Sequence, residues 1–471
     1  MKLYEKLVDD LVRLIESEVL RPGERLPSIR QLARSRSISP GTVLQAYGVL
    51  EDKGIVEARA RSGYFVASQA KELFPVPETY QPGSLSTPVD VSELVFRILE
   101  AAKDRHVVPF GSAFPSPLLF PLRQLSHAMS RAIRTLDPWR TVEDLPPGNR
   151  QLRRLISRRY LDSGCTINQE GIVITSGALE GLNLCLQAVT SPGDIVAVES
   201  PTFYGALQAI EAHSLRVVEI PTDPRYGVKV DALEQALKRH PIRACWFMTN
   251  FQNPLGSLMP EENKRALVEL LNRCQVPLIE DDVYGELFLR GERPPPAKAF
   301  DTEDLVLHCS SFSKCLAPGF RVGWAAPGRY TRQVRQRKLI TTLSATIPAQ
   351  AALVTYLERG GYERHLRRLR HALASQQHAM LTAINRYFPS GCRVTCPDGG
   401  YFLWLELPTE TNSVEVHRRA MEAGISVSPG PMFSAHRGFR NRLRLNYGHG
   451  WSQRKEEAMQ ALGAIIADHD G

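Results

Sequence analysis

The sequence contains no apolar run long enough to span a lipid bilayer, and its first residues lack the apolar segment of a secretory signal. Its eight cysteines are scattered through 471 residues. The closest pair, Cys392 and Cys396, has no second pair or flanking histidine that would complete a zinc pattern. These absences argue against a membrane protein and a disulfide-stapled secreted protein. They predict a cytoplasmic chain with reduced thiols and no metal site.

Neither sign of charge is in large excess: 58 Lys and Arg stand against 50 Asp and Glu, a net charge of +8. The distribution says more than the total. Between residues 25 and 66 there are seven basic residues, opposed only by Glu51, Asp52 and Glu57. A local basic surface of this kind is typical of DNA-binding domains. The length of the chain predicts two or more domains.

Residues 1–68 follow the pattern of three helices and a β-hairpin. Apolar residues recur at helical spacing over residues 4–19. Ser28, three residues before Gln31, predicts the cap of a second helix, and Ser39-Pro40 predicts the start of a third. Two short strands then flank a turn that contains Gly63. This order predicts a winged helix-turn-helix, an α+β fold.

This region resembles the GntR family of bacterial regulators. The resemblance rests on residues 26–33 (LPSIRQLA), Thr42-Val43, Ala46-Tyr47, Leu50 and residues 63–66 (GYFV), in that order. It implies that the third helix enters the major groove of double-stranded DNA. The DNA contacts expected on this basis are Ser39, Thr42, Gln45, Arg30, Arg59, Arg61 and Gly63. For each arginine alone, a solvated surface charge is an equal alternative.

Residues 69–91 are rich in Pro, Ser and Thr without apolar periodicity, which predicts an extended, mobile linker. From residue 92 to 471, apolar strands alternate with helical stretches every ~20–30 residues, which predicts an α/β domain with a mainly parallel sheet. The expected strands are residues 172–174, 195–198, 217–220, 245–248, 277–279 and 305–307. In such sheets, ligands bind beyond the carboxyl ends of the strands.

The segments that follow these strands resemble fold-type I, class I aminotransferases, from about residue 109 to 460. The resemblance rests on residues 311–314 (SFSK) with 318–323 (PGFRVG), residues 253–256 (NPLG) and residues 281–284 (DDVY), in the family's order and spacing. A winged helix joined to such a domain is the arrangement of the MocR-like regulators, a branch of the GntR family.

The resemblance implies a pyridoxal phosphate (PLP) cofactor joined as a Schiff base to Lys314, the expected catalytic residue. Burial and nearby positive charge would lower the pKa of this amine and make it nucleophilic. Asp281 would hold the proton of the pyridine nitrogen. The other implied cofactor contacts are Ser176, Gly177, Ala178, Phe203, Asn253, Tyr284, Ser311 and Arg321. For Phe203, ordinary core packing is a serious alternative.

The segment 441–446 (NRLRLN) resembles the part of the family that binds a substrate carboxylate. Arg444 is the expected clamp, and Arg442 is the alternative, expected to face solvent. The aromatic residue that often precedes Gly148 in the family is missing, because residues 143–147 read EDLPP. This departure weakens the case for efficient transamination but not for cofactor binding.

Two functions stay open at this stage. The first is a regulator that senses PLP or an amine or amino-acid ligand and transmits the signal to a DNA-binding domain. The second is an active PLP-dependent aminotransferase that carries a DNA-binding domain. The winged helix favours the first, because a metabolic enzyme has no need of one. The resemblance also implies a homodimer.

Overall fold

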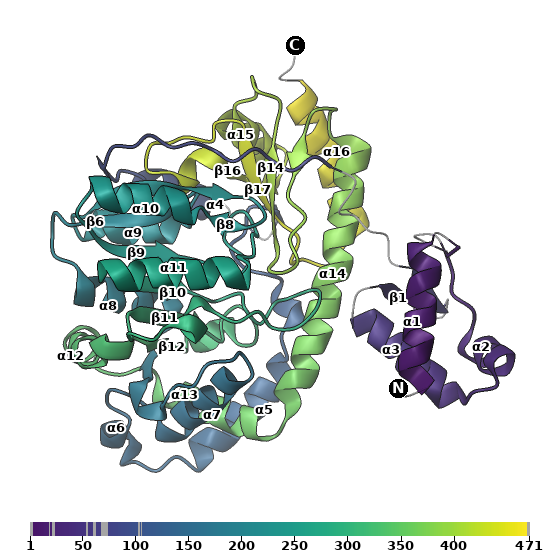
Figure 1. Cartoon of the computed structure of the whole chain (residues 1–471), viewed down its shortest axis with the longest axis horizontal. Coiled ribbons are helices and arrows are strands. Elements are labelled where there is room, and N and C mark those ends of the chain that lie inside the picture. The colour runs from purple at the N-terminus through teal and green to yellow at the C-terminus, as the bar shows by residue number, and fades with distance from the viewer. Residues whose placement is uncertain are drawn as a thin grey trace. The chain divides into compact units, whose positions relative to one another are not determined.

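The structure, a computed structural model, describes residues 3–17, 19–20, 24–52, 55–59, 63–66, 74–101, 104 and 106–468. The chain forms two compact units, residues 1–73 with 289–292, and residues 74–288 with 293–471. Figure 1 labels many of the elements and colours the chain from purple at the N-terminus to yellow at the C-terminus.

The small unit has the predicted three helices and a hairpin. Its elements are α1 (Leu3–Glu16), α2 (Ile29–Arg36), α3 (Pro40–Asp52), β1 (Val56–Arg59) and β2 (Gly63–Val66). The two strands pair antiparallel, with Val56 opposite Val66. Ser28 caps α2 as predicted: its hydroxyl oxygen accepts a 3.3 Å hydrogen bond from the N–H of Gln31.

One face of α3 forms the centre of the small unit's core. Val43, Ala46, Tyr47 and Leu50 recur at helical spacing and are completely buried. The hydroxyl of Tyr47 donates a 2.6 Å hydrogen bond to the carbonyl oxygen of Pro27, which ties α3 to the segment before α2. Because this face is buried, the first turns of α3 present their other side to solvent.

The large unit is built on a mainly parallel sheet, as predicted. Its strands, in spatial order, are β3 (Thr87–Pro88), β7 (Arg216–Asp223), β6 (Ile195–Ser200), β9 (Ile242–Phe247), β10 (Leu278–Asp281), β11 (Val306–Ser311), β12 (Gly323–Ala326) and β5 (Val173–Thr175), with β8 (Gly227–Val228) paired to β7. The five strands from β7 to β11 run parallel, and β12 is antiparallel to both of its neighbours. Figure 1 shows β6, β9, β10, β11 and β12 following one another across the unit.

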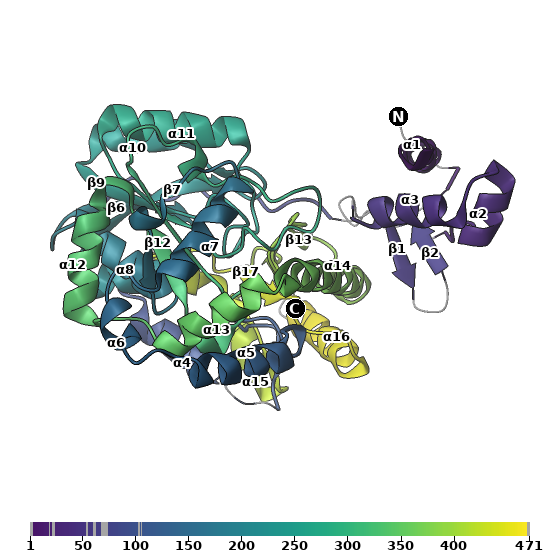
Figure 2. The same ribbon diagram turned by 90° about the horizontal axis from the view of Figure 1, so that it is seen from below.

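Helices cover both faces of this sheet. The helices of the large unit are α4 (Ser92–Ala101), α5 (Leu122–Arg134), α6 (Arg140–Glu143), α7 (Arg150–Leu161), α8 (Ala178–Val189), α9 (Tyr204–Ala212), α10 (Val230–Arg239), α11 (Glu261–Cys274), α12 (Thr331–Thr341), α13 (Ile347–Glu358), α14 (Gly361–Tyr387), α15 (Ser413–Glu422) and α16 (Gln453–Ala467). Apolar residues of α10 and α11 pack on one face, and Figure 2 shows these two helices together on one side of the sheet. No helix in the described ranges is both long and apolar enough to cross a membrane.

The C-terminal part adds a second, four-stranded sheet. Its strands, in spatial order, are β13 (Arg393–Val394), β14 (Phe402–Glu406), β17 (Arg442–Asn446) and β16 (Ser428–Pro429). The short strands β15 (Ile425–Ser426) and β4 (Val108–Pro109) pair with each other. Gly111 follows β4, and its carbonyl oxygen accepts a hydrogen bond from the hydroxyl of Ser428 on β16. The segment after residue 109 is therefore held close to the four-stranded sheet.

The expected linker differs from the prediction in its described part, residues 74–91. The N–H of Glu78 donates to a carboxylate oxygen of Glu406 at 3.0 Å, and the rings of Tyr80 and Phe439 lie 4.4 Å apart. Strand β3 pairs with the edge strand β7. These residues therefore pack along the large unit instead of moving freely. Pro-rich extended chain suits the edge of a sheet, since proline has no N–H to donate.

Candidate functional site

Three polar segments meet at the carboxyl ends of neighbouring strands. Asp281 is the last residue of β10, Ser311 is the last residue of β11, and residues 250–256 follow β9. These three strands are adjacent and parallel in the centre of the sheet. Their polar ends therefore gather at one edge, where α/β sheets bind ligands.

Lys314 lies three residues beyond β11 and is only partly buried. Its Nζ donates a 2.9 Å hydrogen bond to the carbonyl oxygen of Ala113 and lies 3.9 Å from the ring centre of Phe114. Loss of hydration, and then the positive charge of Arg444, lower the pKa of Lys314 to about 7, although Asp281 acts in the opposite direction. Near neutral pH a large share of this amine is therefore unprotonated and nucleophilic.

Asp281 and Asp282 are both buried but have opposite surroundings. One carboxylate oxygen of Asp281 is buried with no hydrogen-bond partner, and burial, together with Asp282, raises the pKa of Asp281 to about 7. Asp282 accepts hydrogen bonds from Arg293 (2.9 Å) and Asn250 (3.0 Å) and lies 3.1 Å from His308 Nε2. Burial would raise the pKa of Asp282, but Arg293 and His308 outweigh it and lower the pKa. Asp282 is thus satisfied within the protein, whereas Asp281 still has an oxygen to accept a proton or hydrogen bond.

A tight loop after β5 places backbone N–H groups beside a guanidinium group. Gly177 has φ +91°, and a Cβ at this position would lie 2.5 Å from Nη2 of Arg321. The same Nη2 donates to the carbonyl oxygen of Ser176 at 3.1 Å, and the N–H of Ser176 is already bound to Glu180. The N–H groups of Gly177 and Ala178, at the start of α8, and the Arg321 guanidinium form a cradle suited to a phosphate.

Two serines lie just before Lys314: Ser311 ends β11, and Ser313 lies on the turn that follows. The hydroxyl oxygen of Ser311 accepts a 3.3 Å hydrogen bond from the N–H of Ser313. The hydroxyl of Ser313 is buried without a partner, and sequence analysis did not single it out. Phe203 is half-buried at the start of α9, with its ring 4.9 Å from that of Tyr204.

Arg444 is completely buried on β17. It donates hydrogen bonds to the carbonyl oxygen of Gly111 (2.9 Å), to Asn253 Oδ1 (3.0 Å) and to the hydroxyl of Ser428 (3.1 Å), while its Nε has no partner. The alternative, Arg442, does not face solvent as expected. It is buried and forms an ion pair with Glu406, because β14 places that carboxylate directly opposite.

Several groups around Lys314 were missed by sequence analysis. The hydroxyl of Tyr401 donates to the same carbonyl oxygen of Ala113 that accepts from Lys314, at 3.1 Å. The rings of Tyr401 and Tyr284 lie 5.3 Å apart and are nearly perpendicular. Burial raises the pKa of both phenols, so they remain neutral donors. Tyr284 was expected from the motif at residues 281–284, but no local motif marks Tyr401, which the fold brings from a distant part of the sequence.

The small unit places its predicted DNA contacts on exposed surface. Arg30, Ser39 and Gln45 are exposed. The hydroxyl oxygens of Ser39 and Thr42 lie 2.8 Å apart at the start of α3. Gly63 opens β2 with φ +100°. Arg61 and the side chain of Arg59 lie outside the described residues.

The sequence matches the aminotransferase class I and II family over residues 124–462, nearly three quarters of the chain. The chain belongs to this family. Residues 3–66 match the gntR family of bacterial regulatory proteins. The family predictions made from the Lys314 segment and from the winged-helix pattern are therefore confirmed, and so is the combination of folds.

Relatives of both kinds are found. An uncharacterized HTH-type transcriptional regulator of Escherichia coli, YdcR, is 47% identical over 99% of this chain and all of its own length. Among solved structures, the kynurenine aminotransferase of Pyrococcus horikoshii, in complex with PMP, superposes with a TM-score of 0.74, 31% identity and coverage of 80% of this chain and 95% of its own. LysN, an α-aminoadipate aminotransferase of Thermus thermophilus complexed with N-(5'-phosphopyridoxyl)-L-leucine, gives a TM-score of 0.72 at 28% identity, covering 81% and 99%.

These similarities agree with the geometry. The chain is a GntR-type regulator fused to an aminotransferase-like domain, and the family of that domain is PLP-dependent. The expected cofactor fits the residues present, since a buried oxygen of Asp281 has no partner and Gly177 leaves room that a Cβ would fill.

Proposed function

We propose that this chain is a DNA-binding transcription regulator that holds PLP on Lys314 and responds to PLP or to an amine or amino-acid ligand. One combination carries the proposal: a winged helix in the same chain as a low-pKa lysine beside an unsatisfied buried aspartate. Perturbed titratable groups of this kind cluster at functional sites.

Each residue of the site has a proposed role toward the cofactor. When bound, PLP supplies an electron sink for chemistry at an amine carbon. The Lys314 amine would hold it covalently, and Asp281 would keep the proton on its ring nitrogen. Asn253 and Tyr284 would bind its 3-oxygen, with Phe203 against its ring. Its phosphate would be bound by Ser176, Gly177, Ala178, Ser311 and Arg321.

Arg444 gives the proposed ligand a chemical class. A planar guanidinium matches the geometry of a carboxylate, and the unpartnered Nε of Arg444 can donate to one. An α-amino acid combines such a carboxylate with an amine that can replace Lys314 on the cofactor. The ligand would also compete with Asn253 and Ser428 for Arg444, which gives the site two arrangements.

A homodimer is part of the proposal. Leu339, Ile340 and Leu343, around the end of α12, are 48%, 83% and 54% exposed. Clustered apolar side chains of this size on a surface are typical of interfaces. A dimer would present two winged helices to paired half-sites of an operator, with Arg30, Ser39, Thr42, Gln45, Arg59, Arg61 and Gly63 toward the DNA. Such a regulator would act in the cytoplasm, where the DNA is.

An aminotransferase with a DNA-binding domain is the second candidate. It is favoured by the intact set of Lys314, Asp281, Asn253 and Arg321 around one site. The regulator is distinguished from the enzyme by coupling between ligand binding and DNA binding. A ligand regulates DNA binding only if it binds two states of the protein with different affinity.

The coupling is measured as operator affinity. Full-length protein selects an operator from a pool of random-sequence duplexes, and its affinity is then compared without cofactor, with PLP, and with PLP plus each of the common amino acids. We expect one ligand to change the affinity by about 5- to 150-fold, the usual range of allosteric coupling. Unchanged affinity in every condition, together with keto-acid formation, would establish the enzyme instead.

Attachment of PLP should depend on pH. Because the pKa of Lys314 is about 7 in the cofactor-free protein, the neutral amine increases as pH rises through 7. The rate of attachment, followed by stopped-flow absorbance of the bound cofactor, should rise about tenfold per pH unit below 7 and level off above about 8. If the rate of attachment instead keeps rising up to pH 10, the lysine that binds PLP has an ordinary pKa.

A further inference from the structure

Most of the chain's excess positive charge lies outside the winged helix. Residues 1–73 contain 12 Lys and Arg against 10 Asp and Glu, so six of the eight excess charges belong to the rest of the chain. Two segments there are strongly basic. Residues 150–159 contain five arginines and no acid, and residues 359–371 contain five arginines, two histidines and only Glu363 as an acid.

In α7 the arginines form a stripe. Arg150, Arg154 and Arg158 are four residues apart, so they lie along one side of the helix, and all three are exposed. The opposite side of α7 is buried through Leu152 and Leu155. The stripe spans about 12 Å, at 1.5 Å of rise for each residue.

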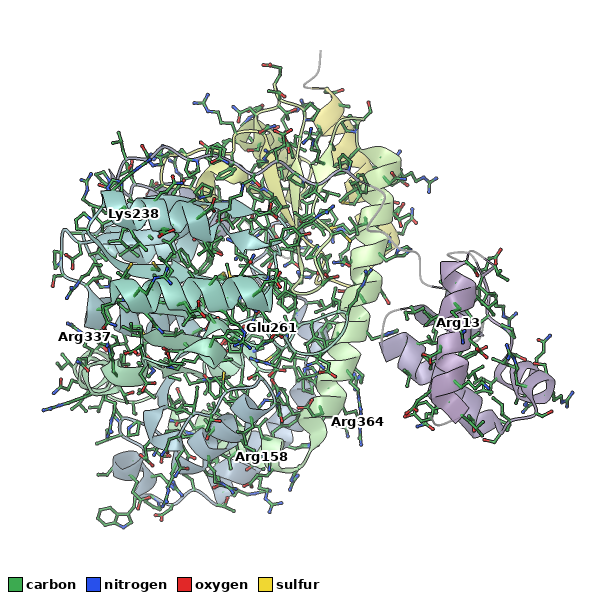
Figure 3. All side chains as sticks on the ribbon, viewed as in Figure 1. Arg13, Arg158, Lys238, Glu261, Arg337 and Arg364 are labelled. Atoms are coloured by element: carbon green, nitrogen blue, oxygen red, sulfur yellow. The ribbon has the colours of Figure 1, made fainter. Side chains whose placement is uncertain are left out.

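A second stripe lies on α14. Arg364, Arg367 and Arg368 follow helical spacing and are exposed, whereas Leu366 and Leu369 are buried on the other side of the helix. The two helices are joined where Arg159 Nη1 of α7 donates to Glu363 of α14 at 2.7 Å. Figure 3 shows Arg158 and Arg364 on the lower side of the large unit, with Lys238 at its upper left. We call the exposed arginines 150, 154, 158, 364, 367 and 368 the basic face.

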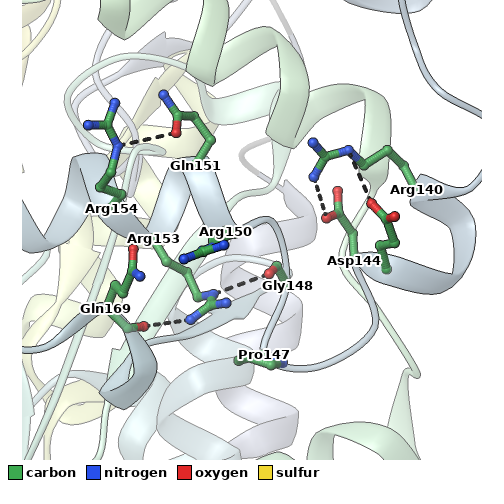
Figure 4. Close-up of a pocket in the computed structure, with 10 residues that line it drawn as sticks. Arg140, Asp144, Pro147, Gly148, Arg150, Gln151, Arg153, Arg154 and Gln169 are labelled. Atoms are coloured by element: carbon green, nitrogen blue, oxygen red, sulfur yellow. Dashed lines mark hydrogen bonds and ion pairs between the residues drawn. The ribbon is translucent and has the colours of Figure 1, made fainter.

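A cavity of about 570 Å³ lies at the α7 end of the basic face. Four arginines line it: Arg140, Arg150, Arg153 and Arg154. Figure 4 shows that Arg153 donates to the carbonyl oxygens of Gly148 and Gln169, and that Arg140 is paired with Asp144. Arg150 and Arg154 remain exposed to a ligand from outside.

The nearby acids do not neutralise the basic face. Glu363 is paired with Arg159, Glu170 with the buried Arg153, and Glu358 accepts a hydrogen bond from Gln151 of α7. Among the described residues, Arg158, Arg364 and Arg367 form no ion pair. The positive charges of these arginines repel one another, and an external polyanion would reduce this repulsion.

We infer that the basic face of α7 and α14 binds the phosphate backbone of double-stranded DNA, as a second DNA contact of the large domain. Arginine suits this ligand, because its planar fork of donors binds phosphate oxygens. The winged helix, which binds DNA in the proposed function, keeps duplex at high effective concentration near the same chain. Because the basic face contacts phosphates and not base edges, it increases the affinity for DNA and its salt dependence without adding sequence specificity.

The test compares three full-length proteins binding a long random-sequence duplex over a range of salt concentrations. The first is wild type and the second carries Arg158→Gln, Arg364→Gln and Arg367→Gln. The third is a charge-matched control with Arg239→Gln, Arg243→Gln and Arg273→Gln, three exposed arginines on α10, β9 and α11. We expect the basic-face variant alone to lose at least about 10-fold in affinity and roughly 2–3 units of the slope of log Kd against log salt. Visible absorption of bound PLP in all three proteins shows that the large domain is folded.

Two outcomes overturn the inference. If wild type binds duplex and the basic-face variant matches the control, the face does not bind DNA. If the variant keeps full DNA affinity but loses binding to vesicles rich in phosphatidylserine, the face serves an anionic membrane surface. A wild type without affinity for any duplex would instead refute the proposed function itself, on which this inference rests.

Discussion

Lys314→Ala is expected to abolish covalent binding of PLP completely. The methyl group has no amine, and Lys314 is the lysine at the carboxyl ends of β10 and β11, with its Nζ held by the carbonyl oxygen of Ala113. Its lowered pKa makes it reactive near neutral pH, whereas an ordinary lysine is almost entirely protonated there. The phosphate cradle at Gly177 and Arg321 would remain, so weak reversible binding can persist. The visible absorption band of lysine-bound PLP should nevertheless be absent.

The measurement is the absorption spectrum of protein mixed with PLP, reduced with borohydride and mapped by mass spectrometry. Lys314→Arg is the first control, because it keeps the positive charge but stays protonated. Lys238→Ala, at an exposed position on α10, is the second and should bind PLP like wild type. A reduced adduct on another lysine in wild type would refute the assignment of Lys314. If Lys314→Ala loses the band yet keeps the effect of PLP on DNA affinity, the signal does not need the covalent bond.

The sequence allowed prediction of those parts of the site that are contiguous. Residues 311–314 form a motif because the last residue of β11, Ser311, and the short turn that follows it, with Lys314, belong to the same site. Asp281 could be placed for the same reason, as the end of a buried strand. The alternation of apolar strands and helical stretches was sufficient to predict the parallel sheet, since each strand is buried on both faces.

Groups that only the tertiary structure brings together could not be predicted. Ala113 and Phe114 belong to a segment far from Lys314 in the sequence, held in place by bonds such as the 2.8 Å one from Asn446 Nδ2 to the carbonyl oxygen of Phe114. The prediction that residues 74–91 move freely was wrong for a related reason. Residues 74–91 have no apolar period of their own, and only the exposed edge of β7 and a ring such as Phe439 give them a place to pack.

Asp281→Asn is expected to have two effects of opposite sign. In the cofactor-free protein, burial raises the pKa of Asp281 to about 7, above its ordinary value of 3.8. The folded state therefore binds this proton more tightly than the unfolded state. The contribution of this proton to the free energy of unfolding is complete below about pH 4. It is lost as pH rises through 7, which lowers the free energy of unfolding by a few kcal/mol. Asparagine has no such charge, so at pH 8 the cofactor-free variant should have a higher Tm than wild type.

With cofactor the order reverses. Asparagine cannot hold a proton on the ring nitrogen, so the variant should gain little Tm from PLP and should react with amino acids about 100-fold more slowly or worse. Calorimetry with and without PLP, and the rate at which an amino acid bleaches the bound cofactor, measure the two effects. A variant that keeps the full PLP-dependent rise in Tm and the wild-type rate would show that Asp281 does not contact the ring nitrogen.

The neighbouring Asp282→Asn is the matched control, with the opposite expectation for the cofactor-free protein. It removes a charge that is paired with Arg293 and bonded to Asn250 and His308. Removing this charge leaves the buried guanidinium of Arg293 with Glu286, 3.3 Å away, as its remaining ion-pair partner, at a cost of up to about 3–5 kcal/mol. The same chemical change at adjacent positions should therefore raise Tm at 281 and lower it at 282. The two variants differ because Asp282 is bound by Arg293, Asn250 and His308 within the protein, whereas the expected partner of Asp281 is the ring nitrogen of the cofactor.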